Sequence, residues 1–164
     1  MNKPLERLFK KTKTKFKLLT HKKVYTAFDE AETLASSSRE RSGQGKKLSE
    51  IAKAVLVKVD KGLALVVVPA GKYIDFKSIK KALKAKKVSI AKELDITKKL
   101  KTKIGLLHPF GNLYKIPTLL DRALAKSKKI IAAAGSYTDS VELSVKDFEK
   151  IVSPIKGVFS KKKK

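Results

Sequence analysis

One lysine in an apolar segment is the residue of this chain best placed to do chemistry. Lys53 stands between Ala52 and Ala54, and on a strand it should share a face with Ile51 and Val55 because side chains alternate. A partly enclosed ammonium offers three donors and a compact charge, which suit a phosphate or a carbonyl oxygen. With 40 Lys and Arg residues in the chain, a solvated surface lysine is the alternative interpretation.

A loop over residues 105–117 holds further candidates, among them Gly105, His108 and Gly111. Both glycines could be ordinary turn residues, or they could let the backbone approach a ligand, since Gly tolerates positive φ. Loop N–H groups held in this way can stabilise the oxyanion that develops on an ester, and losing one such donor costs about 10²–10³ in rate. His108 could be structural, could line a pocket, or could transfer a proton near neutral pH.

Two polar candidates follow predicted strands. Ser136 comes directly after Gly135, at the end of the apolar run Ile130–Ala134. A nucleophilic role for Ser136 is disfavoured, because no Gly-x-Ser-x-Gly elbow surrounds it and no acid–histidine partner is evident. A substrate hydrogen bond or a loop cap suits it better. Asp121 could order a site by hydrogen bonding, or it could simply cap the turn into Arg122.

The composition excludes several kinds of site. The chain has no cysteine, so disulfides, cysteine-based zinc sites and thiol nucleophiles are excluded. With only His21 and His108, a histidine-rich metal centre is not expected either. Gly43–Lys47 lacks the spacing of a Walker phosphate loop and the Ser or Thr that follows its lysine. We therefore expect a site without metal or cofactor.

The charge of the chain points to a polyanionic partner. Its 164 residues indicate one domain, and 40 basic residues against 15 acidic ones give a net charge of +25. Self-repulsion at this charge opposes compactness, and nucleic acid is the polyanion that most often relieves it. The longest apolar run, Leu63–Ala70, is too short to span a bilayer, and Met1–Lys17 lacks a secretory apolar region. We expect a cytoplasmic protein without a membrane partner.

The clearest structural prediction is a strand pair. Lys53–Lys58 and Leu63–Pro69 are rich in Val and Leu, and the turn Val59–Gly62 has hairpin chemistry. Other short strands and helices alternate irregularly around this pair. Strands are predicted over residues 13–19, 88–91, 116–120, 130–134 and 141–143. Helices are predicted over residues 4–11, 74–86 and 92–101, from Thr26, and from Ser144 to Pro154. The fold class is mixed α/β: one domain with a mixed, largely antiparallel, barrel-like sheet surrounded by short helices.

Five segments, in order, resemble the YbaK/aminoacyl-tRNA deacylase family, which is related to the editing insertion of bacterial prolyl-tRNA synthetases. They are Thr20–Ala27, Glu50–Lys58, Val66–Ala70, Gly105–Asn112 and Gly135–Ser144. The resemblance implies an editing domain over residues 18–156, with a flexible loop at 36–47, between a basic segment at 1–17 and a basic tail at 157–164.

The resemblance also implies an activity: hydrolysis of the ester that joins a wrong amino acid to the terminal ribose of tRNA. Family members use neither metal nor a protein nucleophile, so the substrate, its ribose hydroxyl or water acts instead. Lys53 matches the family lysine and becomes the catalytic candidate. The substrate-binding candidates are Gly105, His108, Pro109, Phe110, Gly111, Asn112, Asp121, Gly135 and Ser136. Tyr137 stands where some relatives have histidine, which puts in doubt a histidine-dependent step in that loop.

The implied partner is mischarged tRNA, and an aminoacyl-tRNA synthetase is a second candidate partner. An alternative function on the same fold is a non-catalytic module that binds tRNA or another RNA. The charge supports both functions, but phosphate binding alone would not need Lys53 or the loop Gly105–Pro109. A third interpretation is a basic surface protein whose lysines reflect a lysine-biased or high-salt proteome.

Overall fold

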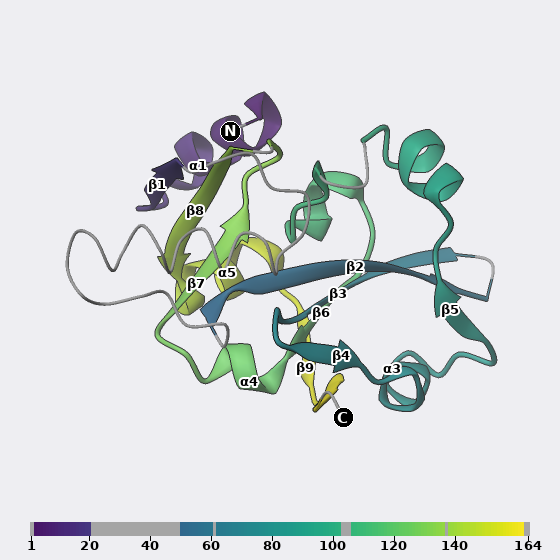
Figure 1. Ribbon diagram of the computed structural model, residues 1–164. Coiled ribbons are helices and arrows are strands. Elements are labelled where there is room, and N and C mark those ends of the chain that lie inside the picture. Colours follow the sequence, from purple (N-terminus) through teal and green to yellow (C-terminus); the bar gives the residue numbers. More distant parts are fainter. Residues whose placement is uncertain (1, 21–49, 61, 103–105, 137, 163–164) are drawn as a thin grey trace.

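The computed structural model describes residues 2–20, 50–60, 62–102, 106–136 and 138–162 (Figure 1). The helix predicted from Thr26 and the loop predicted at 36–47 lie outside these residues. The strands are β1 (Lys17–Thr20), β2 (Ala52–Val59), β3 (Gly62–Pro69), β4 (Lys72–Ile74), β5 (Val88–Ile90), β6 (Thr118–Asp121), β7 (Lys129–Ala133), β8 (Asp139–Ser144), β9 (Ile155–Gly157) and β10 (Ser160–Lys162). The helices are α1 (Lys3–Thr12), α3 (Phe76–Ala82), α4 (Arg122–Ala125), α5 (Val145–Val152), the π-helix η2 (Asp95–Lys99) and the 3₁₀ helix η4 (Gly111–Tyr114).

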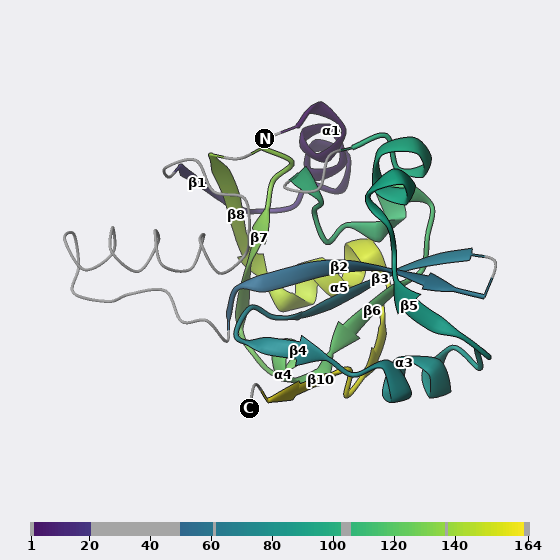
Figure 2. The ribbon, with the colours of Figure 1, turned by 45° about the vertical axis from the view of Figure 1, so that its right-hand side comes forward.

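The predicted hairpin is confirmed, and it forms the middle of the molecule. Strands β2 and β3 pair antiparallel along their full length, from Ala52 opposite Pro69 to Val59 opposite Gly62, and run side by side across Figures 1 and 2. Asp60 begins the turn with a φ of 51°. Its carboxylate accepts from the Lys87 backbone N–H at 2.9 Å, which ties the turn to the start of β5.

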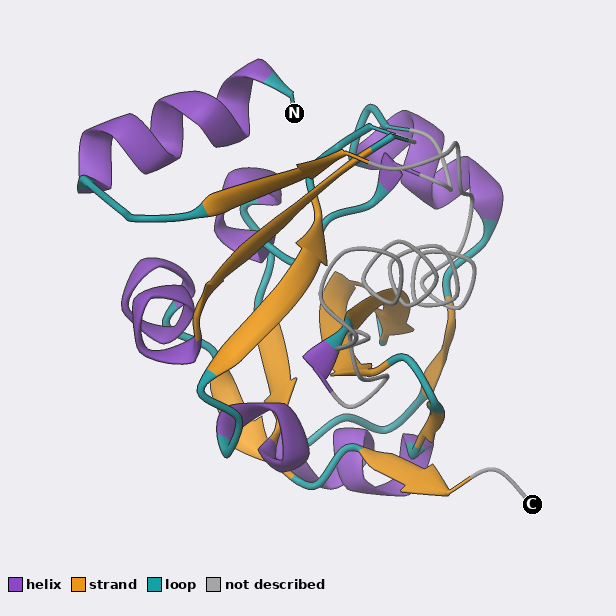
Figure 3. Ribbon diagram, turned by 60° about the vertical axis from the view of Figure 1, so that its left-hand side comes forward, coloured by secondary structure: helices purple, strands orange, loops and turns teal. Residues whose placement is uncertain are grey.

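The described strands form three sheets. One has the order β5-β2-β3-β6-β9, in which β3–β6 and β6–β9 are parallel. A second, antiparallel sheet has the order β1-β8-β7, and β4 pairs with β10 in a third. A parallel bridge between Ile51 and Ile131 joins the first two sheets. The predicted mixed, largely antiparallel architecture is confirmed, and helices surround the strands (Figure 3). Over the described residues, the strands form three sheets that do not close into one barrel.

Side-chain alternation in the five-stranded sheet creates two cores. On one face, Ala52 and Val67 pack in a cluster with Phe110 and Phe148. On the other, Val66 packs with the α3 side chains and with the C-terminal segment. The regular β2–β3 register keeps successive residues on opposite faces.

The last predicted helix is confirmed in its cap and its end. The Ser144 hydroxyl accepts from the Asp147 N–H at 3.1 Å, and α5 is followed by its C-cap Ser153, which has a left-handed backbone and directly precedes Pro154.

The helix predicted over 74–86 is shorter: β4 extends to Ile74, and the Asp75 side chain caps α3. The sequence predicts a basic tail at 157–164. Lys161 and Lys162 are exposed, but their backbone pairs with β4. Among the described residues, no helix has the length and apolar character needed to cross a membrane.

Candidate active site

Lys53 lies near the start of β2, where it pairs with Val68 of β3. Its side chain is half-buried, and its Nζ donates to the Lys72 carbonyl oxygen at 2.6 Å. Lys72 opens β4, directly after the turn that follows β3. A backbone carbonyl therefore fixes the direction of the ammonium, as a group that must orient a substrate requires.

Three segments that are far apart in sequence meet at Ala52, the residue before Lys53. Ala52 shares one hydrophobic cluster with Phe110 and Ala134. Phe110 follows Pro109, and Ala134 precedes Gly135. The chain therefore brings the backbone of the family lysine, of the 108–112 loop and of the 135–136 loop around one core.

The Lys53 side chain itself leaves β2 on the opposite face from that cluster. Lys53 and its cross-strand partner Val68 alternate with Ala54. Ala54 and Leu107 both pack against one apolar cluster on the other face of β2. The ammonium instead reaches the β4 backbone. Across the described residues, the three segments therefore meet in one core, but the Lys53 side chain does not contact the apolar side chains of the 108–112 loop. Gly105 lies outside the described residues, so its predicted contact with the site stays a prediction.

His108 forms the centre of its loop. Only 2% of the residue is exposed, its ring stacks on Tyr114 with centroids 4.5 Å apart, and its Nδ1 accepts from the Phe110 N–H at 3.3 Å. Burial lowers the pKa of His108 to about 4 and raises the pKa of Tyr114 to about 12. At neutral pH the imidazole is uncharged, with its proton assigned to Nε2 from the hydrogen bond at Nδ1. A ring with so low a pKa is a weak base, which favours a loop-framing role.

The rest of this loop packs tightly, apart from one residue. Pro109, Phe110 and Gly111 are buried, whereas Asn112 is exposed. A Cβ on Gly111 would overlap the Thr118 side-chain oxygen, so only glycine lets η4 pack this closely on β6. The loop is therefore closely packed on β6, and Asn112 is exposed on its outside.

The second loop is held by its own backbone and by α1. Gly135 has a φ of 79°, and a Cβ there would overlap the Asn2 side chain. The Asn2 N–H donates to the Ala134 carbonyl oxygen at 2.9 Å. The Ser136 hydroxyl oxygen accepts from the Asp139 N–H at 3.1 Å and from the Thr138 N–H at 3.3 Å, which makes it a loop cap.

Helix α1 touches both loops, a role that has no counterpart among the sequence predictions. Asn2 caps the helix through Oδ1, which accepts from the Leu5 N–H at 3.0 Å. Phe9 packs edge-to-face on Phe110, with centroids 5.5 Å apart. The helix itself is predictable from the Asn cap, the Pro in its first turn and the apolar residues Leu5 and Phe9. Its packing on the loops depends on tertiary structure and has no local signal.

Asp121 is buried and serves the backbone. Its Oδ2 accepts from the Ala123 N–H at 3.2 Å, and its Oδ1 accepts from the Phe159 N–H at 2.7 Å. The sequence allows two roles for Asp121, ordering a site or capping the turn into Arg122, and the structure shows Asp121 as the N-cap of α4. Contact with a substrate stays a prediction. Within the described part of the chain, no group of three or more His, Asp or Glu side chains could hold a metal ion.

Comparisons with solved structures identify the fold. The hypothetical protein APE2540 is 20% identical and superposes with a TM-score of 0.80, covering 97% of this chain and 100% of its own. A protein provisionally assigned as a trans-editing enzyme for prolyl-tRNA synthetase is 15% identical, with a TM-score of 0.73 and coverage of 98% and 99%. A scaffold protein used for epitope grafting by computational design is 15% identical, with a TM-score of 0.76 and coverage of 96% and 95%.

The sequence itself matches a family model. The model describes an aminoacyl-tRNA editing domain, and it matches residues 21–151. This range includes β2 with Lys53 and both loops, and it leaves α1 and the segment from β9 onward outside. Since the match spans most of the chain, this protein belongs to the aminoacyl-tRNA editing domain family.

Proposed function

We propose that this protein is a free-standing deacylase that hydrolyses the ester between a wrong amino acid and the terminal ribose of a tRNA. The family match over residues 21–151 is the observation that carries the proposal. The resemblance of Lys53 and of the two loops to the family motifs supports it. Such an enzyme works where tRNA is charged, in the cytosol, and an aminoacyl-tRNA synthetase is a candidate partner.

In this proposal Lys53 orients the substrate. Its ammonium, directed by the Lys72 carbonyl, holds a phosphate or ribose oxygen of the tRNA end, or the carbonyl oxygen of the ester. A compact point charge suits all of these oxygens. Residues 108–111 of the first loop are buried, and the exposed Asn112 is the residue of this loop that can reach a ligand.

The chemistry needs no protein nucleophile. A water molecule, which a hydroxyl of the substrate can position, adds to the ester carbonyl carbon and loses one proton. The bond to the ribose oxygen breaks, and that oxygen takes the proton, so the products are the free amino acid and the tRNA hydroxyl. Backbone N–H groups of the two loops are the candidate donors to the oxyanion. The Ser136 hydroxyl oxygen accepts two backbone N–H groups, which supports a structural role for this side chain.

A panel of mischarged tRNAs tests the proposal. We expect the protein to release the amino acid from at least one member faster than spontaneous hydrolysis, and at the same rate after dialysis against a chelator. Loss of activity on chelation would contradict the metal-independent mechanism. No acceleration on any member, with tRNA still bound, would favour the second candidate function, a non-catalytic tRNA-binding module, which the net charge of +25 supports.

A further inference from the structure

A groove with a strongly basic lining lies at the end of β7 that is opposite the 135–136 loop. Its volume is about 850 Å³. It is lined by Arg122, Ala125, Lys126, Ser127, Lys128, Ser144, Val145, Lys146, Glu149 and Lys156. We call it the basic groove. None of the predicted site residues lines it.

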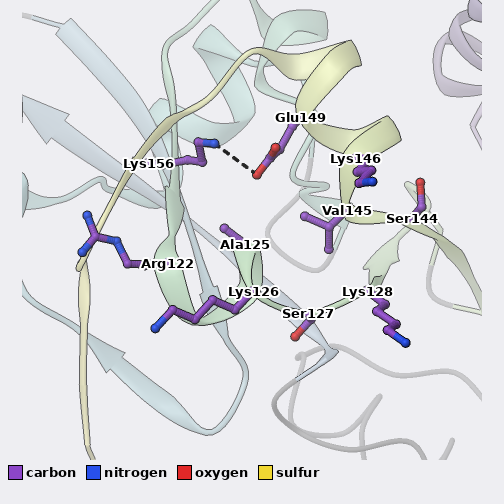
Figure 4. Close-up of a pocket in the computed structure, with 10 residues that line it drawn as sticks. All are labelled: Arg122, Ala125, Lys126, Ser127, Lys128, Ser144, Val145, Lys146, Glu149 and Lys156. Atoms are coloured by element: carbon purple, nitrogen blue, oxygen red, sulfur yellow. Dashed lines mark ion pairs between the residues drawn. The ribbon is translucent and has the colours of Figure 1, made fainter.

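Several elements contribute to the basic groove. Helix α4 and the segment leading to β7 supply Arg122, Lys126 and Lys128, the start of α5 supplies Lys146, and β9 supplies Lys156. Figure 4 shows the cations arranged around Ala125 and Val145. The Val145 N–H donates to the Lys128 carbonyl oxygen at 3.0 Å, so the two sides of the groove are joined by backbone and form a fixed frame.

The charges in the groove are poorly balanced. Among the lining residues that the structure describes, five cations face one carboxylate, Glu149, which pairs with Lys156 at 3.7 Å (Figure 4). The other four cations, Arg122, Lys126, Lys128 and Lys146, are exposed and form no ion pair with any residue that the structure describes. The first turn of α5 adds the positive end of a helix dipole to the same side.

Such a lining fits phosphates better than it fits a protein surface. Protein partners gain most of their affinity from a few buried aromatic or Arg anchors in desolvated pockets. Here the described apolar lining residues are the small Ala125 and the buried Val145, and the cations are exposed. Several cations spaced along an open groove match the repeated charges of a nucleic-acid backbone, whose binding releases counterions.

The position of the groove suits an RNA that also reaches the candidate active site. Lys128 precedes β7, and Gly135 follows it. The groove and the 135–136 loop therefore lie at opposite ends of one strand, about 20 Å apart at the usual rise per residue. We infer that the basic groove binds the phosphate backbone of tRNA, away from its aminoacylated end. The inference rests on the proposed function for the identity of the RNA.

Charge-matched variants test the groove against the rest of this basic surface. The groove variant is Lys126→Gln/Lys128→Gln/Lys146→Gln. The control is Lys77→Gln/Lys80→Gln/Lys81→Gln, which removes three equally exposed lysines from α3, a helix that lies apart from α4 in both views (Figures 1 and 2). Binding of uncharged tRNA is titrated between 50 and 200 mM salt, after thermal unfolding confirms that both variants are folded.

We expect the groove variant to bind more weakly. The slope of log affinity against log salt, which is negative, should decrease in magnitude by about 3, one for each lysine that no longer neutralises a phosphate. For the control, the magnitude of the slope should decrease by less than about 1. Equal losses of affinity in the two variants, or no tRNA binding by the wild-type protein, would overturn the inference. Because the ligand carries no ester, the result does not depend on deacylase activity, so this inference and the proposed function can fail separately.

Discussion

Asn2 lies so close to Gly135 that a methyl group on Gly135 would overlap the Asn2 side chain. The same asparagine caps α1 and donates its backbone N–H to Ala134. One residue thus caps the first helix and holds the 135–136 loop, which resembles a family motif. The loop geometry is therefore coupled to a helix that lies outside the family match.

Substituting Gly135 should reveal this coupling. Gly135→Ala forces a side chain into the left-handed region and against Asn2, and we expect a loss of about 1–3 kcal/mol in the free energy of unfolding. Asn2→Gly alone should cost only a few tenths of a kcal/mol, because Gly is a tolerable cap. The double variant should be more stable than the sum of the single losses predicts, since Asn2→Gly makes room. Urea denaturation measures all three, and strict additivity would show that the two residues are independent.

Removing the Lys53 ammonium should abolish most deacylation. We expect Lys53→Ala to lower the rate on mischarged tRNA by about 10²-fold or more, as for other oriented donors, while tRNA affinity falls little because many other lysines carry it. Lys53→Arg should restore little activity, because a planar fork does not replace a compact ammonium.

The matched control for Lys53 is Lys58→Ala, an exposed lysine on the same strand. It should leave the deacylation rate near that of the wild type. Full activity in Lys53→Ala would remove Lys53 from the site, and equal losses of activity in the two variants would indicate a general effect of charge.

The buried His108 should make stability depend on pH. Its pKa falls from 6.5 to about 4 on folding, so between these values the unfolded chain binds more protons than the folded one. The contribution of the neutral His108 to the free energy of unfolding is therefore fully present above pH 6.5. It is lost as the pH falls toward 4, which lowers the free energy of unfolding by roughly 3 kcal/mol.

His108→Asn provides the comparison, because asparagine keeps an acceptor near Nδ1 but does not titrate. Denaturant unfolding at several pH values should show a smaller acid loss of stability in the variant than in the wild type. Carboxylates titrate in both proteins, so they cancel from the difference. Parallel curves would mean that the histidine is protonated at little cost in the folded state.

Asp121 should be hard to replace even by asparagine. Each of its oxygens accepts one backbone N–H, and asparagine can satisfy only one of them. Asp121→Asn should cost about 1–3 kcal/mol of stability because a buried donor loses its acceptor. Asp75→Asn is the control: Asp75 caps α3 at a more accessible position, where asparagine caps equally well. Equal unfolding midpoints for the two variants would contradict this account.

The elements predicted correctly are those with local signals. The β2–β3 hairpin follows from two β-rich runs around a Gly-containing turn, and α5 follows from the Ser144 cap. Strands β9 and β10 have three residues each and no pattern of their own. They exist because β6 and β4 offer edges to pair with, which no local window contains.

The same limit applies to the candidate site. Asp121 also accepts a hydrogen bond from the N–H of Phe159, 38 residues away. This second structural role of Asp121 has no signal in the local sequence. Alternation correctly assigned Lys53 to the face of Val55, but the sequence does not say which face the 107–110 segment covers. That depends on tertiary packing, which places Phe110 in one cluster with Ala52, and Leu107 against the same cluster as Ala54.

The parallel pairing of β6 with β9 has a consequence for how the chain reaches this state. β6 is an inner strand only because β9 lies beside it, and Phe159, just beyond β9, also supplies the acceptor for the Asp75 N–H at 2.7 Å. On the ribosome, β3 and β6 emerge well before residues 155–159. A nascent chain would therefore expose an apolar strand edge, the kind of surface that recruits chaperones or pairs with other chains. Contacts of such long sequence separation also slow folding, so completing this sheet should be a late event.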